Sequence, residues 1–206
     1  MANKAAFIVD GHQEQKIVQR LCPGSPVRRH NCNGRDVEVA AAAKRIASLI
    51  RLIGNSYYPF VIVFDRESRT TAAMNLAKDI ESQLRSEGIT DELIIGVPDR
   101  MIENWILADW ANAKAKGAFV ESRPPASIEG TNGKGVVMKS LPRGGRYHET
   151  IEGVDWFIAC NPSTLCSKSL SFRHFAHQLR ALGCSWLKEA GTRKERGTTA
   201  GKRTQE

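Results

Sequence analysis

Residues 60–65 read Phe-Val-Ile-Val-Phe-Asp, five consecutive apolar residues followed directly by an acid. A short, partly β-branched run of this kind is typical of a strand that is buried on both faces of a parallel sheet. Two similar runs, at 5–9 and 93–97, lie before and after it, and each also leads into an acid, Asp10 or Asp99. The three runs therefore predict a parallel sheet at the centre of the fold.

Apolar residues at helical spacing fill the intervals between these runs. They predict a helix before Cys22, a long helix over 36–53 that Asp36 caps, a helix over 71–88 and a helix after Asp99. Strand and helix thus alternate through the first 115 residues. This alternation predicts an α/β, Rossmann-like fold, with a mostly parallel sheet and helices on both faces.

The second half of the chain has a different composition. Residues 117–145 are rich in Gly, Pro, Ser and Lys and are predicted to be irregular, and helices are expected near 151–159 and 171–182. We therefore predict an α/β core at 1–116, and at 117–187 an irregular insertion with a helical C-terminal extension that completes the domain.

The net charge suggests a polyanionic partner without identifying it. The chain has 206 residues, and 30 Lys and Arg against 22 Asp and Glu give +8. The last stretch, 188–206, holds six of the basic and three of the acidic residues and is predicted to be a disordered basic tail. The rest of the chain therefore has only a mild basic excess.

Other features of the composition address location. No apolar run approaches the roughly 18–20 residues of a membrane span, and the N-terminus lacks the pattern of a secretory signal. The five cysteines include no CxxC pair, which favours a reducing compartment over a disulfide framework. We therefore expect a cytoplasmic protein without a membrane partner.

Acidic residues follow each predicted strand. Because the carboxyl ends of parallel strands meet at one edge of a sheet, acids distant in the sequence should converge there. Such a group is tolerable mainly around a divalent cation, and carboxylate oxygens suit Mg²⁺ or Mn²⁺. The alternative is that the acids cap helices, which is the role assigned to Asp36 and Asp99. The acids expected to converge are Asp10, Glu14, Asp65, Glu67 and Glu103.

Four segments carry a resemblance to TOPRIM proteins, which include topoisomerases, primases and the overcoming-lysogenisation-defect nucleases. Ile8-Val9-Asp10-Gly11-His12-Gln13-Glu14 resembles their first motif, and Val63-Phe64-Asp65-Arg66-Glu67 resembles their Asp-x-Asp motif. Glu103-Asn104-Trp105-Ile106-Leu107-Ala108-Asp109 is similar to the Glu-x-Trp-x-x-Ala-Asp signature of a small bacterial TOPRIM-like family of uncharacterised function. Ser171-Phe172-Arg173-His174-Phe175 is similar to that family's closing element. The resemblance covers about residues 5–180.

The resemblance implies a Mg²⁺- or Mn²⁺-dependent nuclease that cuts DNA or RNA. It also implies a role in antiviral defence, often beside an ATPase partner and possibly in a larger complex. The implied metal ligands are Asp10, Asp65, Glu67 and Glu103, and the implied catalytic set adds Glu14 and Lys139. Within that set, Glu14 and Glu67 are second ligands or bases that orient water. Lys139, favoured by the resemblance, or alternatively Lys168, stabilises charge on the phosphate.

Two positions depart from the TOPRIM pattern. TOPRIM proteins usually have Glu where this chain has Asp10, and Asp where it has Glu67. Asp10 is one methylene shorter than the usual residue and Glu67 is one methylene longer, so the two changes could compensate around a metal. The alternative is a catalytically degenerate module that binds nucleic acid or scaffolds a defence complex.

Basic residues outside the tail could hold a phosphate backbone. The segment 25–35, which contains His30, is expected to be an exposed basic loop. A rim of cations around the acidic edge would bind nucleic acid in a sequence-independent way. The alternative is that these residues are scattered, solvated surface charges without a function. The candidate nucleic-acid-binding residues are Arg28, Arg29, Lys134, Arg143 and Arg146.

Overall fold

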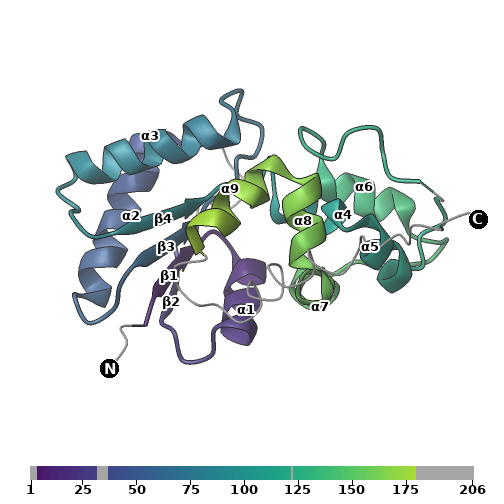
Figure 1. The fold of residues 1–206 in the computed structure, drawn as a ribbon, viewed down its shortest axis with the longest axis horizontal. Helices are drawn as coiled ribbons and strands as arrows, with labels where there is room; N and C mark the ends of the chain where they lie inside the picture. Colours follow the sequence, from purple (N-terminus) through teal and green to yellow (C-terminus); the bar gives the residue numbers. More distant parts are fainter. Residues whose placement is uncertain (1–3, 32–36, 122, 180–206) are drawn as a thin grey trace, which may run out of the picture.

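A four-stranded parallel sheet forms the centre of the molecule. The computed structural model describes residues 4–31, 37–121 and 123–179. The strands are β1 (Ala6–Val9), β2 (Val27–Arg29), β3 (Phe60–Val63) and β4 (Leu93–Gly96), and their order in the sheet is β2-β1-β3-β4 (Figure 1). All neighbouring strands are parallel. The predicted α/β class and parallel sheet are therefore confirmed.

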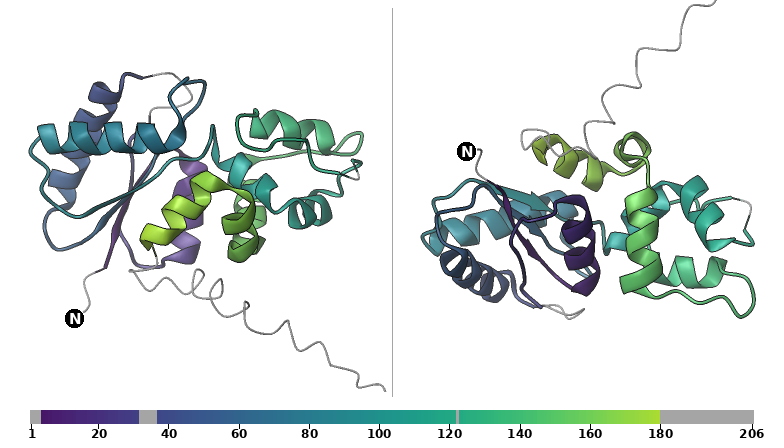
Figure 2. Two further views of the ribbon diagram at one scale, coloured as in Figure 1. Left: turned by 45° about the horizontal axis from the view of Figure 1, so that its top comes forward. Right: turned by 90° about the horizontal axis from the view of Figure 1, so that it is seen from below.

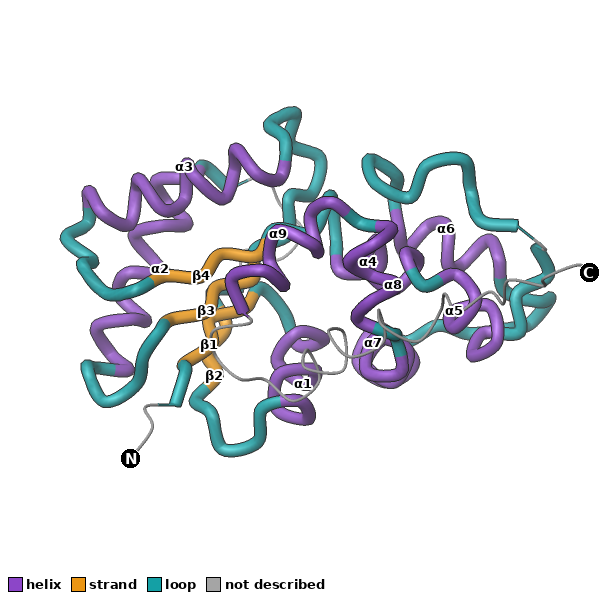
Figure 3. Tube along the Cα trace, in the orientation of Figure 1, coloured by secondary structure: helices purple, strands orange, loops and turns teal. Residues whose placement is uncertain are grey.

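Alternate residues of the strands pack on opposite faces of the sheet. Ile8 and Ile62 belong to a buried cluster with helices α2 (Val39–Ile53) and α3 (Ala73–Ser86). Phe7 and Val61 belong to a second cluster with α1 (His12–Leu21) and α9 (Leu170–Leu179) (Figure 3). Both faces are covered, which explains why the strands are almost continuously apolar.

The remaining helices form a group beside the sheet (Figure 2). Helix α9 then returns over β4, where the Phe175 ring packs on Gly96 so closely that a Cβ at Gly96 would lie 2.6 Å from it. The second half of the chain is thus joined to the sheet. The helices of this group are α4 (Ile102–Ala108), α5 (Trp110–Gly117), α6 (Gly133–Ser140), the π-helical turn η1 (Glu149–Gly153), α7 (Val154–Ala159) and α8 (Pro162–Lys168).

The expectation of an exposed basic loop at 25–35 is wrong for its central residues. Val27–Arg29 is strand β2, which pairs with β1 so that Arg29 stands opposite Val9. His30, directly after the strand, is fully buried. β2 has only three residues, and two of them are arginines, so no apolar run marks it as a strand in the sequence.

The expectation that 117–145 is irregular is wrong for α6. The Asn132 side chain caps this helix by accepting a hydrogen bond from the Gly135 amide at 2.9 Å. Gly133 lies so close to α4 that a Cβ at this position would be 2.8 Å from the backbone nitrogen of Asn104, which leaves no room for a side chain. Gly133, which suggests a loop in the sequence, is therefore needed in this helix for close packing against α4.

Other boundaries also differ from the prediction. The helix after Asp99 is two helices, α4 and α5, and α8 was not predicted. The predicted cap Asp36, the end of the helix expected at 171–182 and the tail at 188–206 lie outside the described residues. Within the described ranges, no helix is long and apolar enough to cross a bilayer.

Candidate metal centre

Three carboxylates converge at the carboxyl edge of the sheet. Asp10 directly follows β1, and Asp65 and Glu67 follow the neighbouring strand β3. One oxygen from each of the three lies within 4.8 Å of the others. The parallel arrangement therefore brings together residues that are 55 positions apart in the sequence, and these three are the acidic cluster discussed below.

Asp65 is the least satisfied member of the acidic cluster. Its Oδ1 atom is buried and has no hydrogen-bond partner. Burial raises the pKa of Asp65 well above its ordinary value, and the neighbouring carboxylates of Glu14 and Asp10 raise it further. A buried oxygen without a donor, among other carboxylates, fits a hard divalent cation, which prefers oxygen ligands.

Glu67 adopts a backbone conformation that is unusual for a residue with a side chain. Its φ is +57°, in the left-handed region that favours glycine. The Glu67 amide donates to the Arg100 carbonyl at 2.7 Å, and Arg100 Nε donates back to the Glu67 carbonyl at 3.3 Å. Backbone strain of this kind is often retained where the side chain has a function.

Asp99 does not cap a helix, contrary to the prediction. Helix α4 begins after Met101, whereas Asp99 Oδ1 lies 3.3 Å from Arg66 Nε in an ion pair. Arg66 also donates through Nη2 to the Asp99 carbonyl at 3.2 Å. Asp99 therefore ties the loop after β4 to the loop that carries Asp65 and Glu67.

Glu14 and Glu103 were expected to join these acids, but neither belongs to the group whose oxygens lie within 4.8 Å of one another, and only their charges act on Asp65. Glu14 Oε2 accepts a hydrogen bond from the Gly11 amide at 2.9 Å, so Glu14 also fulfils the alternative role of a helix-capping acid. Burial raises the pKa of Glu14 to about 7, and the charges of Glu103 and Asp10 contribute. Burial likewise raises the pKa of Glu103.

Tyr147 and His30 contact the acids, and the sequence prediction assigned neither residue to the site. Tyr147 donates its hydroxyl hydrogen to Glu103 Oε1 at 2.8 Å. His30 Nδ1 lies 3.6 Å from Asp10 Oδ1, and His30 Nε2 lies 3.3 Å from the Val63 carbonyl oxygen. His30 therefore reaches across the end of β1 to β3. Recognition of β2 in the sequence would have placed it at this edge.

The lysine beside the acids is Lys134. It forms an ion pair with Glu149, and its charge also acts on Glu103. Lys139 is exposed and five residues further along α6, which places it about 140° around the helix from Lys134. The catalytic role of Lys139 stays a prediction.

The candidate nucleic-acid-binding residues are dispersed over several elements. Arg28 is exposed on β2, and Arg29 is half-buried beside the end of β1. Arg143 and Arg146 are exposed between α6 and η1. Contact of these residues with nucleic acid stays a prediction.

Two of the segments that resemble TOPRIM-like proteins contact each other. Trp105 is buried, donates through Nε1 to Ser171 Oγ at 2.9 Å and stacks on Phe175 with ring centroids 5.5 Å apart. Asp109 caps α5, and its Oδ2 atom accepts a hydrogen bond from the Asn161 backbone amide at 2.8 Å. Trp105 and Asp109 therefore serve the structure, and Glu103 is the member of its segment whose charge acts on Asp65.

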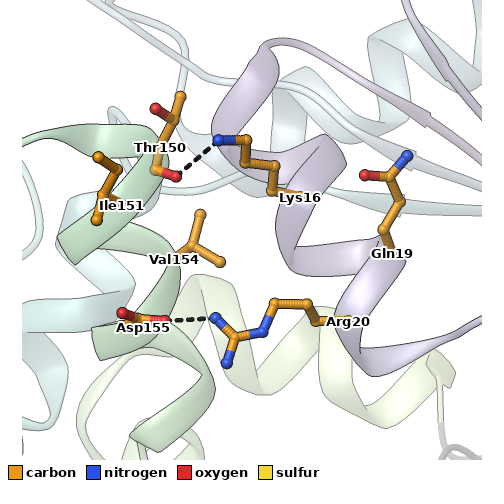
Figure 4. A pocket seen from close by; sticks show the side chains of 7 residues that line it. All are labelled: Lys16, Gln19, Arg20, Thr150, Ile151, Val154 and Asp155. Atoms are coloured by element: carbon orange, nitrogen blue, oxygen red, sulfur yellow. Dashed lines mark hydrogen bonds and ion pairs between the residues drawn. The ribbon is translucent and has the colours of Figure 1, made fainter.

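A groove lies between helix α1 and the segment formed by η1 and α7 (Figure 4). Lys16 donates to the Thr150 carbonyl at 3.1 Å, and Arg20 forms an ion pair with Asp155. Both cations are therefore engaged in joining α1 to the helical group.

Comparison of the chain with protein-family models, with curated proteins and with solved structures finds no match.

Proposed function

We propose that this chain is a Mg²⁺- or Mn²⁺-dependent nuclease of the TOPRIM type that hydrolyses phosphodiester bonds in DNA or RNA. The observation that supports the proposal most directly is the acidic cluster, in which one oxygen of each carboxylate lies within 4.8 Å of the others and the buried Asp65 Oδ1 has no hydrogen-bond partner. Three hard oxygen ligands at the carboxyl edge of a parallel sheet match the chemistry of such enzymes.

In this proposal each residue of the site has a distinct role. Asp10, Asp65 and Glu67 hold the cation, and Glu103 is the further ligand that the sequence motif implies. A bound divalent cation would activate a water molecule and stabilise the leaving oxygen of the phosphodiester. Glu14, a buried carboxylate whose charge acts on Asp65, is the candidate base. Lys134 joins Lys139 as a candidate for contacting the phosphate.

The net charge of the chain is compatible with a polyanionic substrate. The chain carries +8 overall, while its acids gather at the sheet edge. Contacts between surface cations and a phosphate backbone would make binding salt-dependent and independent of sequence. The defence role and the ATPase partner are supported by the motif resemblance alone.

The proposal is tested by nicking of supercoiled plasmid DNA in Mn²⁺ and in Mg²⁺, with single-stranded RNA as a second substrate. Asp65→Asn keeps the size of the side chain and removes its charge, and Asp79→Asn, on the exposed side of α3, is the matched control. We expect metal-dependent cutting that falls at least 100-fold in Asp65→Asn and is unchanged in Asp79→Asn. Equal cutting by both variants would contradict the proposal.

A second candidate function, a catalytically degenerate module that binds nucleic acid or scaffolds a complex, is favoured by Asp10, where TOPRIM proteins usually have Glu. Asp10→Glu restores the longer side chain. Cutting by Asp10→Glu but not by the parent chain would favour the degenerate module. Cutting by the parent chain would favour the active enzyme.

A further inference from the structure

The first half of the chain supplies the acids, but the second half holds one of them in place. Tyr147, between α6 and η1, donates its hydroxyl hydrogen to Glu103 Oε1 at 2.8 Å. The same hydroxyl lies 3.4 Å from Gln13 Nε2 on α1. Tyr147 therefore links two helices that follow different strands.

The chemistry of the three groups fixes the direction of these hydrogen bonds. A carboxylate only accepts, so the single hydroxyl hydrogen of Tyr147 goes to Glu103. The hydroxyl oxygen can then only accept a further hydrogen bond, so the Gln13 side-chain amide donates to it. The result is a chain of hydrogen bonds from Gln13 through Tyr147 to Glu103.

Packing around Tyr147 leaves little room for another arrangement. Its ring lies against Trp156, with centroids 5.3 Å apart. Gly153 approaches so closely that a Cβ there would lie 2.5 Å from the Tyr147 hydroxyl and 2.4 Å from Gln13 Nε2. The φ of Gly153 is −60°, so the position requires glycine for space rather than for conformation.

We infer that Tyr147 is a positioning residue of the metal centre, which holds Glu103 toward the acidic cluster with Gln13 as its support. Glu103 is 3% exposed, and its Oε1 atom is held by the Tyr147 hydroxyl. Fixing Oε1 orients the carboxylate, whose charge acts on Asp65. The inference rests on the proposed function and gives the second half of the chain a part in it.

The test is Mn²⁺ binding measured by calorimetry on the full chain. Tyr147→Phe keeps the ring and removes only the hydroxyl, and Gly153→Ala displaces the hydroxyl by crowding it. We expect both to raise the Kd for Mn²⁺ about tenfold, because loss of a group that orients a ligand typically has an effect of this size. Tyr58→Phe, at an exposed tyrosine, is the matched control and should leave the Kd unchanged.

A purely structural role is distinguished by repeating Tyr147→Phe in a Glu103→Gln background. If Tyr147 acts through Glu103, the second substitution should change the Kd less than twofold, because the carboxylate it orients is already lost. A full tenfold loss in that background would overturn the inference, as would unchanged binding in both Tyr147→Phe and Gly153→Ala. Absence of Mn²⁺ binding to the parent chain would instead overturn the proposed function.

Discussion

At the scale of single residues, Glu67 combines a strained backbone with a position in the acidic cluster. Its φ of +57° costs about 1 kcal/mol in a residue with a Cβ. We predict that Glu67→Gly raises the free energy of unfolding by about 1 kcal/mol relative to Glu67→Gln, because both remove the charge and only glycine relieves the strain. Urea denaturation of the two metal-free variants measures the difference.

The same two variants report on function. Neither retains a carboxylate at position 67, so both should bind Mn²⁺ more weakly than the parent chain. A glycine variant that is less stable than the glutamine variant would show that the strain is relieved elsewhere in the loop.

The residues of the site were predictable to different degrees. Asp10, Asp65 and Glu67 each follow an apolar run, and the geometry of a parallel sheet is enough to bring them together. Tyr147 reaches the site from a segment 44 positions after Glu103, and no local pattern connects the two. Its role depends on how the helical group docks, which the sequence periodicity does not encode.

At the scale of elements, the length of the apolar run decided what the sequence could predict. The runs at 5–9, 60–64 and 93–97 are long enough to identify β1, β3 and β4. The three residues of β2 are held by pairing with β1, which is a tertiary interaction. Helix α6 begins Gly-Lys-Gly, and its low intrinsic helix propensity is outweighed by the Asn132 cap and by contact with α4.

At the scale of the whole molecule, the buried acids should make stability depend on pH. The ordinary pKa of Glu14 is 4.5, and burial raises it to about 7 in the folded state. Below pH 4.5 both states are protonated and Glu14 has no effect. As pH rises from 4.5 to 7 the unfolded state ionises first, so folding stability falls. Asp65 and Glu103, whose pKa values are also raised, act in the same direction.

We therefore predict that Glu14→Gln stabilises the metal-free chain at pH 8 and has little effect at pH 4.5. The expected difference is on the order of a few kcal/mol, because a tenfold change in a proton-binding constant corresponds to roughly 1.4 kcal/mol. Burial lowers the pKa of His30, which destabilises the fold at acid pH. This contribution is the same in the parent chain and in Glu14→Gln, so it cancels when their stabilities are compared. Urea unfolding in the presence of a chelator at the two pH values measures the effect, and an equal effect at both would contradict it.

The central claim is that the acidic cluster holds a divalent cation, and calorimetric titration with Mn²⁺ at neutral pH tests it most directly. Asp65 lacks a partner for its buried Oδ1, whereas Asp79 is exposed on α3. We predict that the parent chain and Asp79→Asn bind Mn²⁺ with the same Kd, and that Asp65→Asn weakens binding more than tenfold. Absence of binding to the parent chain, or equal binding by all three proteins, would contradict the account.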